Sequence, residues 1–227
     1  MSRETRQAQE DSDATGVAPR KGRSLLPIIV LVWASMIGSS FAAMLYYHNT
    51  PGHRNDDASV WPLNTAIKLD TNRPNLLVFV HPKCPCSSAT LNELARIQTT
   101  CGSKISTHII IYHPDEEAWD NTRIIRQALE IPNVRIFNDS EGHLSESFGA
   151  MTSGHTFLYA PDGRRIFSGG ITMARGHEGD NLGRSSIVQY ILDGKSICDS
   201  TNIYGCSILN DAASLDVSSG GMSRASE

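Results

Sequence analysis

Mostly apolar runs of strand length alternate with helical patterns in the middle of the chain. Residues 76–80 (LLVFV), 108–112 (HIIIY) and 134–137 (VRIF) form three such runs. The first two runs predict strands that are buried on both faces of a sheet, and the third predicts a short strand. Residues 89–100 and 115–131 carry apolar side chains at helical spacing, which predicts a helix after each of the first two strands.

The pattern changes after the third strand. Residues 141–147 are typical of a polar connection, and residues 155–171 predict two strands around a Pro-Asp-Gly turn. Residues 186–192 predict a last helix, closed by Gly194. Parallel crossovers followed by an antiparallel hairpin, with helices to cover both faces, predict an α/β sandwich with a mixed central sheet.

The N-terminal part of the chain is a charged stretch followed by an apolar one. Residues 1–24 are polar and lack apolar periodicity, so we expect a disordered cytoplasmic tail. Residues 25–47 carry no ionisable group other than two tyrosines and are long enough to cross a bilayer as a helix. Arg20, Lys21 and Arg23 precede this segment, so the positive-inside tendency predicts a cytoplasmic N-terminus and a domain outside the cytoplasm. In a bacterium with two membranes that domain is periplasmic.

A cleaved signal peptide is the alternative to a signal anchor. Ser40-Phe41-Ala42 resembles a small-x-small cleavage site, and cleavage there removes residues 1–42. Both interpretations export the domain. We expect a linker at 48–62, a domain at 63–208 with a short strand at 66–69, and a disordered tail at 209–227.

Charge and motifs narrow the candidate functions. The formal net charge is -4, and no lysine- and arginine-rich stripe is interleaved with aromatic residues. Nucleic acid is therefore not expected as a partner. The sequence has neither a GxSxG nucleophile elbow nor a Walker phosphate loop, which disfavours a serine hydrolase and a P-loop nucleotide binder.

Two of the five cysteines stand one residue apart, in Cys84-Pro85-Cys86, at the predicted turn between the first strand and the first helix. Outside the cytoplasm disulfides form and persist, and an odd number of cysteines leaves at least one thiol free or paired with another molecule. A thiolate at a helix N-terminus is stabilised by the helix dipole and by unpaired amide donors, which lowers its pKa. Lys83 adds a positive charge, and a second thiol can resolve a mixed disulfide formed by the first.

The apolar strand that leads to Cys84, and the cysteine-proline pair that opens a helix, resemble the active-site layout of the thioredoxin-like superfamily. The closest resemblance is to its membrane-anchored extracytoplasmic thiol oxidoreductases. The stretch FGAMTSGHTFLYAPDGRRIFSGGI is similar to the later part of that fold, so the resemblance covers about residues 63–195. It implies a thioredoxin-like sandwich with Cys84 as the attacking and Cys86 as the resolving cysteine. It also implies protein thiols or disulfides as partners and no required cofactor.

Two positions differ from that layout. The superfamily motif has two residues between its cysteines and this chain has one, so a disulfide within the motif closes a smaller and more strained ring. Strain makes a disulfide easier to reduce, and we expect an oxidising or isomerising potential. His155 stands where the superfamily carries its cis-proline. Because a cis bond before a residue other than proline is costly, we expect a trans Gly154–His155 bond, with the imidazole near the two cysteines.

Metal binding is the alternative function for the same residues. Cys84, Cys86 and His155, with His81 as a further candidate, are soft ligands of the kind that bind copper or zinc. Anchored copper-delivery proteins with a thioredoxin fold, which this layout also resembles, use a more widely spaced cysteine pair and a distant histidine. The sequence leaves both functions open.

Two further groups of residues have alternative interpretations. Residues 174–184 are either a substrate loop or a solvated loop in which Asp180 or Asn181 caps the last helix. The substrate-loop candidates are Arg175, His177, Glu178 and Asp180. Cys198 and Cys206 are expected to form a structural disulfide, unless Cys206 reaches the Cys84 turn and relays electrons. Cys101 is then the odd cysteine, which we expect to be half-buried and inert.

Overall fold

The computed structural model describes residues 25–55, 58–114 and 119–209, and its chain divides into two units, Met1–Met44 and Leu45–Glu227. Helix α1 (Leu26–Asn49) is a continuous helix of 24 residues with no buried side chain. Its apolar window has a mean hydropathy of 2.1, so it is long and apolar enough to cross a membrane. A signal sequence meets the same criterion. The tail expected at 1–24, and all of the tail expected at 209–227 except Leu209, lie outside the described residues, and Leu209 packs on the core.

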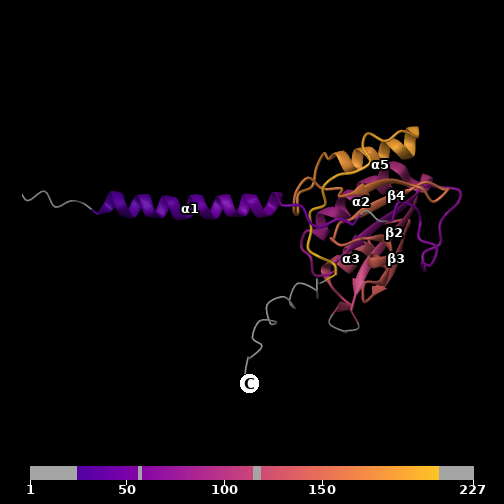
Figure 1. Cartoon of the computed structure of the whole chain (residues 1–227), viewed down its shortest axis with the longest axis horizontal. Helices are drawn as coiled ribbons and strands as arrows, with labels where there is room; N and C mark the ends of the chain where they lie inside the picture. Colours follow the sequence, from indigo (N-terminus) through magenta and orange to yellow (C-terminus); the bar gives the residue numbers. More distant parts are fainter. Residues whose placement is uncertain (1–24, 56–57, 115–118, 210–227) are drawn as a thin grey trace, which may run out of the picture. The chain divides into compact units, whose positions relative to one another are not determined.

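The second unit is built on a five-stranded sheet in the order β3-β2-β1-β4-β5 (Figure 1). The strands are β1 (Asn75–Val80), β2 (Ser106–His113), β3 (Val134–Ser140), β4 (Thr156–Tyr159) and β5 (Arg165–Gly169). The first three are parallel, whereas β4 runs antiparallel to both β1 and β5. All six residues of β1 are buried because the strand has neighbours on both edges and side chains packed on both faces. This mixed α/β sheet confirms the fold class.

Helices cover both faces of the sheet. They are α2 (Ser87–Cys101) with a 3₁₀ turn at Gly102–Lys104, α3 (Arg123–Leu129), α4 (His143–Phe148) and α5 (Leu182–Asp193). On one face, α2, α3 and α5 share a core with alternate residues of β1, such as Val78. On the other, α4 and the chain before β1 bury Trp61 against Phe79 and Phe148. The last helix ends as expected, at Gly194 in the left-handed conformation.

Three local expectations differ from the structure. Helix α3 begins at Arg123 rather than at residue 115, and residues 115–118 lie outside the described residues. The connection at 141–147 contains α4, whose first turn is fixed by Asp139: its buried carboxylate accepts the main-chain N–H of Leu144 at 2.6 Å and of Ser145 at 2.9 Å. Residues 66–69 form no strand, and Ile67 is buried in the core instead.

Residues 48–62, expected as a linker, are packed on the domain. The Gly52 N–H donates to the Ile203 carbonyl at 2.8 Å, and the Thr152 hydroxyl donates to the His53 carbonyl at the same distance. Trp61 is 8% exposed and meets the rings of Phe148 and Tyr159 edge-on. The compact unit therefore begins before residue 63, because these side chains complete its core.

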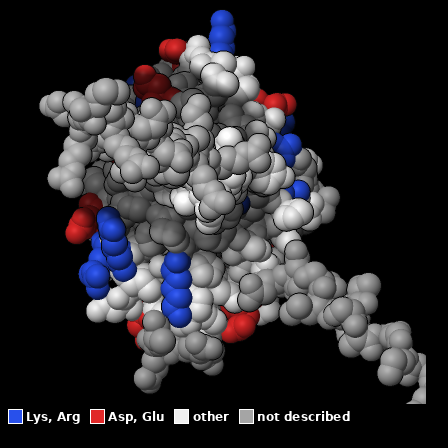
Figure 2. All heavy atoms as spheres, turned by 90° about the vertical axis from the view of Figure 1, so that its left-hand side faces the viewer, with Lys and Arg blue, Asp and Glu red and all other residues white. Residues whose placement is uncertain are grey.

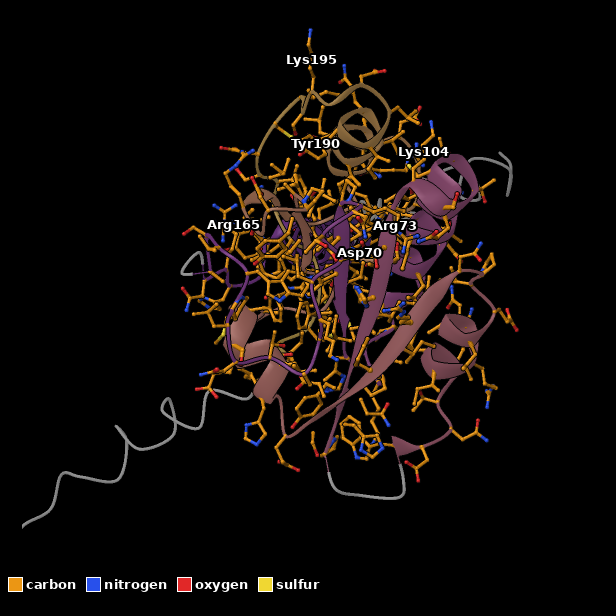
Figure 3. All side chains as sticks on the ribbon, turned by 90° about the vertical axis from the view of Figure 1, so that its right-hand side faces the viewer. Asp70, Arg73, Lys104, Arg165, Tyr190 and Lys195 are labelled. Atoms are coloured by element: carbon orange, nitrogen blue, oxygen red, sulfur yellow. The ribbon has the colours of Figure 1, made fainter. Side chains whose placement is uncertain are left out.

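Charged side chains are distributed over the surface of the described residues. On the face drawn in Figure 2, lysine and arginine side chains stand at several separate places with acidic side chains between them. Some of these side chains bind neighbouring groups of the domain. Asp70 binds Arg73 at 2.6 Å in the turn before β1, and Arg165 donates to the Ala58 carbonyl at 3.1 Å (Figure 3). No single basic stripe is visible on that face.

Candidate active site

The Cys84-Pro85-Cys86 segment forms the turn between β1 and α2, as predicted. The Cys84 N–H donates to the His81 carbonyl at 3.0 Å, and the Ser87 N–H donates to the Cys84 carbonyl at 3.1 Å. Helix α2 starts at Ser87, with Cys86 as its N-cap residue. Pro85 is exposed and Cys86 is half-buried, whereas Cys84 is only 1% exposed. The first thiol of the motif is thus the covered one.

The C-terminal segment brings a third cysteine to this turn. The Ser153 N–H donates to the Cys206 carbonyl at 2.8 Å, and the Ile208 N–H donates to the Met151 carbonyl at 2.9 Å. Residues 206–208 therefore run antiparallel beside residues 151–153. This pairing places the Cys206 thiol against Cys84, to which it donates a hydrogen bond. Cys84, Cys86 and Cys206 form one cluster, which we call the thiol site.

Hydrogen bonding separates the acidities of these thiols. The Cys206 thiol is the first cause that lowers the pKa of Cys84, to about 5, and it outweighs the desolvation that acts in the opposite direction. The Cys206 N–H, the Ser87 hydroxyl and the Cys86 N–H also donate to the Cys84 sulfur. The pKa of Cys86 is raised by burial and by the Cys84 charge, and that of Cys206 is raised because its thiol is the donor to Cys84. At neutral pH the thiol site therefore carries one negative charge, on Cys84.

The Ser153 side chain contacts residues of the turn that carries the Cys84 thiolate. Its hydroxyl oxygen accepts the His81 N–H at 2.9 Å and lies 2.7 Å from the Ser87 hydroxyl oxygen. The Ser87 hydroxyl donates to the His81 carbonyl at 3.2 Å, so the Ser153 hydroxyl can donate to Ser87, and the two serines hold the turn that carries Cys84. Sequence reasoning missed Ser153. Its position two residues before His155, in the stretch that resembles the superfamily, was the available signal.

Arg175 is the member of the 174–184 loop that reaches the thiol site. It forms a hydrogen bond with Cys86 and lowers the pKa of that thiol, against the larger effect of burial. Its guanidinium also donates to the Gly205 carbonyl, one residue before Cys206, and to the Tyr47 carbonyl at 3.2 Å. Arg175 thus joins the second cysteine of the motif to the segment that carries the third.

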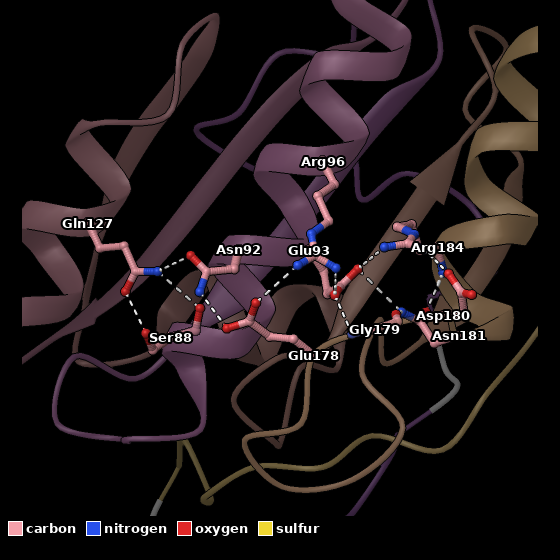
Figure 4. A network of polar contacts seen from close by, with 10 residues as sticks. All are labelled: Ser88, Asn92, Glu93, Arg96, Gln127, Glu178, Gly179, Asp180, Asn181 and Arg184. Atoms are coloured by element: carbon pink, nitrogen blue, oxygen red, sulfur yellow. Dashed lines mark hydrogen bonds and ion pairs between the residues drawn. The ribbon is translucent and has the colours of Figure 1, made fainter.

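The other candidates in this loop bind the domain instead. Glu178 accepts from the Asn92 amide at 2.6 Å, and Asp180 pairs with Arg184 at 2.8 Å (Figure 4). The His177 ring meets the His48 ring edge-on, with centroids 5.7 Å apart. These contacts hold the loop in place, and they leave Arg175 as the loop side chain at the cysteines.

Glu93 is the anchor of that network. Its side chain is fully buried on α2, and it pairs with Arg184 at 2.5 Å and with Arg96 at 3.0 Å (Figure 4). It also accepts the Gly179 N–H at 2.8 Å. Asn181 caps α5 by accepting the Arg184 N–H, so the expected capping role falls to Asn181. A buried carboxylate with this many partners fixes the loop to the helix that starts at the thiol site.

His81 belongs to an aromatic cluster beside the turn. Its ring stacks on Tyr112 with centroids 5.5 Å apart and meets Trp119 edge-on at 5.2 Å. Burial lowers the pKa of His81, although the nearby Cys84 charge acts in the opposite direction. The Lys83 ammonium lies 3.7 Å from the centre of the Trp119 ring. The apolar spacing of residues 115–131 predicts Trp119 on a helix. In the structure it lies before α3 and contacts His81, and no sequence pattern indicates that contact.

His155 has other partners than the cysteines. The structure has no cis peptide bond among the described residues, so the expected trans bond is confirmed. The ring is fully buried, lies 3.0 Å from the Ser168 hydroxyl through Nε2 and stacks on Phe157. Burial, and then the charges of Arg54 and Arg165, lower the pKa of His155 to about 3. The expectation of an imidazole beside the thiols is therefore corrected.

The metal alternative has no preassembled ligand set in the described part of the chain. No group of three or more His, Cys, Asp or Glu side chains there, the three cysteines of the thiol site included, could hold a metal ion. With His155 bound to Ser168, the proposed ligands Cys84, Cys86 and His155 do not converge.

The remaining cysteines lie apart from the thiol site. All five cysteines of the described residues are free, so the expected Cys198–Cys206 disulfide is corrected: Cys206 contacts Cys84 instead. Cys198 is half-buried and packs against the core shared by α2 and α5. Cys101 is 3% exposed, more buried than expected, and burial raises its pKa. Burial and a raised pKa both disfavour the reactive thiolate, so we still expect Cys101 to be inert.

A pocket of about 840 Å³ lies beside the C-terminal segment. Its walls come from the chain around Gly52, Thr172, Leu182 and Asn202, and they include Tyr204, two residues before Cys206. None of the three cysteines of the thiol site lines it. The pocket therefore adjoins the site rather than containing it.

Comparisons with known proteins concern the fold. No protein-family model matches the chain, and no curated protein matches it. An uncharacterized conserved protein from Geobacillus kaustophilus is 15% identical over 71% of this chain and 92% of that chain, with a TM-score of 0.52. A hypothetical protein from Sinorhizobium meliloti 1021 is 20% identical over 70% and 93%, with a TM-score of 0.50. A secreted Mycobacterium tuberculosis disulfide oxidoreductase is 15% identical over 55% and 83%, with a TM-score of 0.39.

The sheet places a cysteine turn between its central parallel strand and the helix that follows, and an antiparallel hairpin completes the same sheet. The proteins from Geobacillus kaustophilus and Sinorhizobium meliloti 1021 share this α/β fold at TM-scores of 0.52 and 0.50.

Proposed function

We propose that this protein carries out thiol–disulfide exchange with partner proteins outside the cytoplasm, through the thiolate of Cys84 in the Cys84-Pro85-Cys86 turn, and that α1 anchors it. One observation carries the proposal. The Cys84 thiol is buried in the turn that opens α2, next to Cys86 and beside the segment that carries Cys206, and the groups of Cys206, Ser87 and Cys86 lower its pKa to about 5. A cysteine with a purely structural role does not require neighbouring groups that lower its pKa.

The exchange balances with the groups present. The Cys84 thiolate attacks one sulfur of a partner disulfide, forms a mixed disulfide and releases the other partner sulfur as a thiolate. A neighbouring thiol of the site loses its proton and attacks the Cys84 sulfur, which releases the second partner thiolate. The domain then holds a disulfide and the partner has gained two electrons. In the opposite direction, a partner dithiol reduces the disulfide of the domain and becomes a disulfide itself.

The acidity of Cys84 sets the preferred direction. Donors that stabilise its thiolate stabilise the reduced domain, and a stabilised reduced form makes the disulfide a stronger oxidant. Strain in a disulfide closed within the motif acts in the same direction. We therefore expect the domain to give its disulfide to partner dithiols.

The location rests on the apolar segment and its flanks. Helix α1 can span a membrane, and Arg20, Lys21 and Arg23 precede it, which favours a cytoplasmic N-terminus. The domain that follows then faces a compartment in which disulfides persist. Thiol–disulfide exchange fits that compartment better than it fits the reducing cytoplasm.

A redox titration of the full chain in detergent tests the proposal. The protein is equilibrated with glutathione buffers, its thiols are counted by mass, and the same sample is analysed for copper and zinc. We expect a two-electron transition that is lost in Cys84→Ser and kept in the control Cys198→Ser. A transition that persists in Cys84→Ser would contradict the assignment. Stoichiometric copper or zinc without a transition would establish the metal alternative.

A further inference from the structure

We propose that the redox disulfide of this domain forms between Cys84 and Cys206, so that the C-terminal segment supplies the second redox thiol and Cys86 remains a thiol. The inference rests on the proposed function, because it assigns the partner of Cys84 in that same exchange. It replaces the resolving role that the sequence resemblance implies for Cys86.

The first support is the fixed position of Cys206. Its carbonyl accepts the Ser153 N–H at 2.8 Å, and Ser207 pairs with Thr152 in a β-bridge. The preceding Gly205 is packed so closely on Ser153 that a side chain there would collide with the Ser153 carbonyl oxygen. Arg175 binds the Gly205 carbonyl as well. The segment is therefore held against the Cys84 turn from both sides of Cys206.

The second support is the place of Cys206 beside the Cys84 turn. Ser153, whose N–H donates to the Cys206 carbonyl, accepts the His81 N–H at 2.9 Å through its hydroxyl, and the His81 carbonyl accepts the Cys84 N–H at 3.0 Å. Cys206 also has the largest effect on the acidity of Cys84, through its thiol and its main-chain N–H. The two residues also lie in different segments, so their pairing is free of the small-ring constraint that acts within the motif.

Cys86 is less suited to the same bond. The residue between the two motif cysteines is Pro85, whose ring fixes the backbone φ. Cys86 itself is the N-cap residue of α2, in a helical conformation with φ -67° and ψ -24°, and its N–H donates to the Cys84 sulfur. Moving Cys86 into a disulfide would disturb the turn that stabilises the thiolate. Arg175 also lowers the pKa of the Cys86 thiol, against the larger effects of burial and of Cys84.

Burial indicates which sulfur meets the partner. Cys206 is half-buried, whereas Cys84 is 1% exposed. In the oxidised domain, a partner thiolate attacks the Cys206 sulfur, the Cys84–Cys206 bond breaks, and the electron pair leaves on Cys84. This is the favoured leaving group because its thiol has the lowest pKa of the site.

The second partner thiolate then attacks the partner sulfur of the mixed disulfide. Cys206 leaves as a thiolate and takes up a proton, which restores the hydrogen bond to Cys84. The partner dithiol has lost two electrons and two protons; the domain has gained the two electrons and one proton, and the other proton enters the solvent. The reduced thiol site described above is the product.

Peptide mapping of the oxidised full chain in detergent tests this pairing. Free thiols are alkylated and the disulfide-linked peptides are identified by mass. We expect a Cys84–Cys206 link with alkylated Cys86 in the wild-type chain and in the control Cys198→Ser. Cys86→Ser should keep the two-electron transition, and Cys206→Ser should shift its equilibrium constant with glutathione by more than tenfold or abolish it.

A pair of substitutions separates the redox role of Cys206 from its role as a donor. Cys206→Ser keeps a hydroxyl donor for the Cys84 thiolate but cannot form a disulfide, whereas Cys206→Ala removes both. The ultraviolet absorbance of the thiolate should therefore titrate near the wild-type pH in Cys206→Ser and at a higher pH in Cys206→Ala.

The outcomes distinguish this pairing from the proposed function. A mapped Cys84–Cys86 disulfide, with a wild-type equilibrium constant in Cys206→Ser, would overturn the pairing and leave the exchange function intact. A wild-type chain without any Cys84-dependent transition would overturn both. A Cys84–Cys206 link in the wild-type chain, with loss of the wild-type transition in Cys206→Ser, supports both the pairing and the exchange function.

Discussion

Oxidation should stabilise the domain by an amount that identifies the disulfide. We consider two variants, Cys86→Ser and Cys206→Ser, each of which leaves Cys84 one partner in the thiol site. In Cys86→Ser the disulfide joins Cys84 to Cys206 and closes a loop of about 120 residues. In Cys206→Ser it joins Cys84 to Cys86 and closes a loop of three residues. The loss of entropy in the unfolded chain differs greatly between them.

The chain-entropy relation gives the size of each effect. A loop of about 120 residues contributes about 5 kcal/mol to the free energy of unfolding at 25 °C, and a loop of three residues about 1.6 kcal/mol before any strain. For a domain of 150–250 residues, 1 kcal/mol shifts the unfolding temperature by about 2–4 °C. Oxidised Cys86→Ser should therefore unfold about 10–20 °C above its reduced form, and oxidised Cys206→Ser at most about 6 °C above.

Thermal unfolding of the full chain in detergent, followed by near-ultraviolet circular dichroism, measures both shifts. Each variant is compared with its own reduced form, so the substitution itself cancels. The wild-type shift should match that of Cys86→Ser. Equal small shifts in the two variants, or a wild-type shift that matches Cys206→Ser, would refute the long-loop assignment.

Four further outcomes follow from the described contacts. The thiolate absorbance of Cys84 should appear with a midpoint at about pH 5, and above it the redox potential should change with pH as for one proton per two electrons; a two-proton slope at pH 7 would contradict the pKa. Glu93→Gln should lower the free energy of unfolding by about 3 kcal/mol, because it leaves Arg184 partly buried without its carboxylate, whereas the control Glu178→Gln, on the surface, should cost less than about 1 kcal/mol. Equal losses would speak against a buried ion pair. His155 has a folded pKa of about 3, below its ordinary value, so the unfolded chain binds more protons and stability falls as the pH drops below about 6.5. His155→Gln should remove up to about 1.4 kcal/mol of that decrease per pH unit, and an unchanged pH dependence of urea unfolding would count against it. An alkaline phosphatase fused after residue 209 should be active in cells and a fluorescent protein fused there dark, and the opposite pair would place the domain in the cytoplasm.

Local chemistry explains why the sheet and the cysteine turn could be predicted. The run LLVFV has no polar position, so it fits only a strand covered on both faces, and the turn residues after it stop the strand. Helix α2 follows from its own apolar spacing, and Gly194 ends α5 because glycine adopts a left-handed conformation at little cost. Each of these features depends on neighbours within a few residues.

Features that depend on distant residues could not be read in the same way. Helix α4 has six residues and owes its start to the Asp139 carboxylate, a contact that no periodicity encodes. Trp119 lies against His81, and its helical spacing pointed to a core position instead. Cys198 and Cys206 are close in sequence, which favoured a disulfide between them, yet the pairing with residues 151–153 carries Cys206 to Cys84. Sequence separation says little about which thiols meet.

The contact between Cys84 and Cys206 also has a consequence for the order in which the chain is made. About 120 residues separate the two cysteines, so a ribosome synthesises Cys84 several seconds before Cys206, at about 5–20 residues per second. During that interval the emerging Cys84 lacks its strongest hydrogen-bond donor and its cover. Its thiol is then more weakly acidic and more accessible to other thiols than in the finished domain. A segment that emerges well after Cys84 is thus the one that gives the first cysteine of the site its acidity.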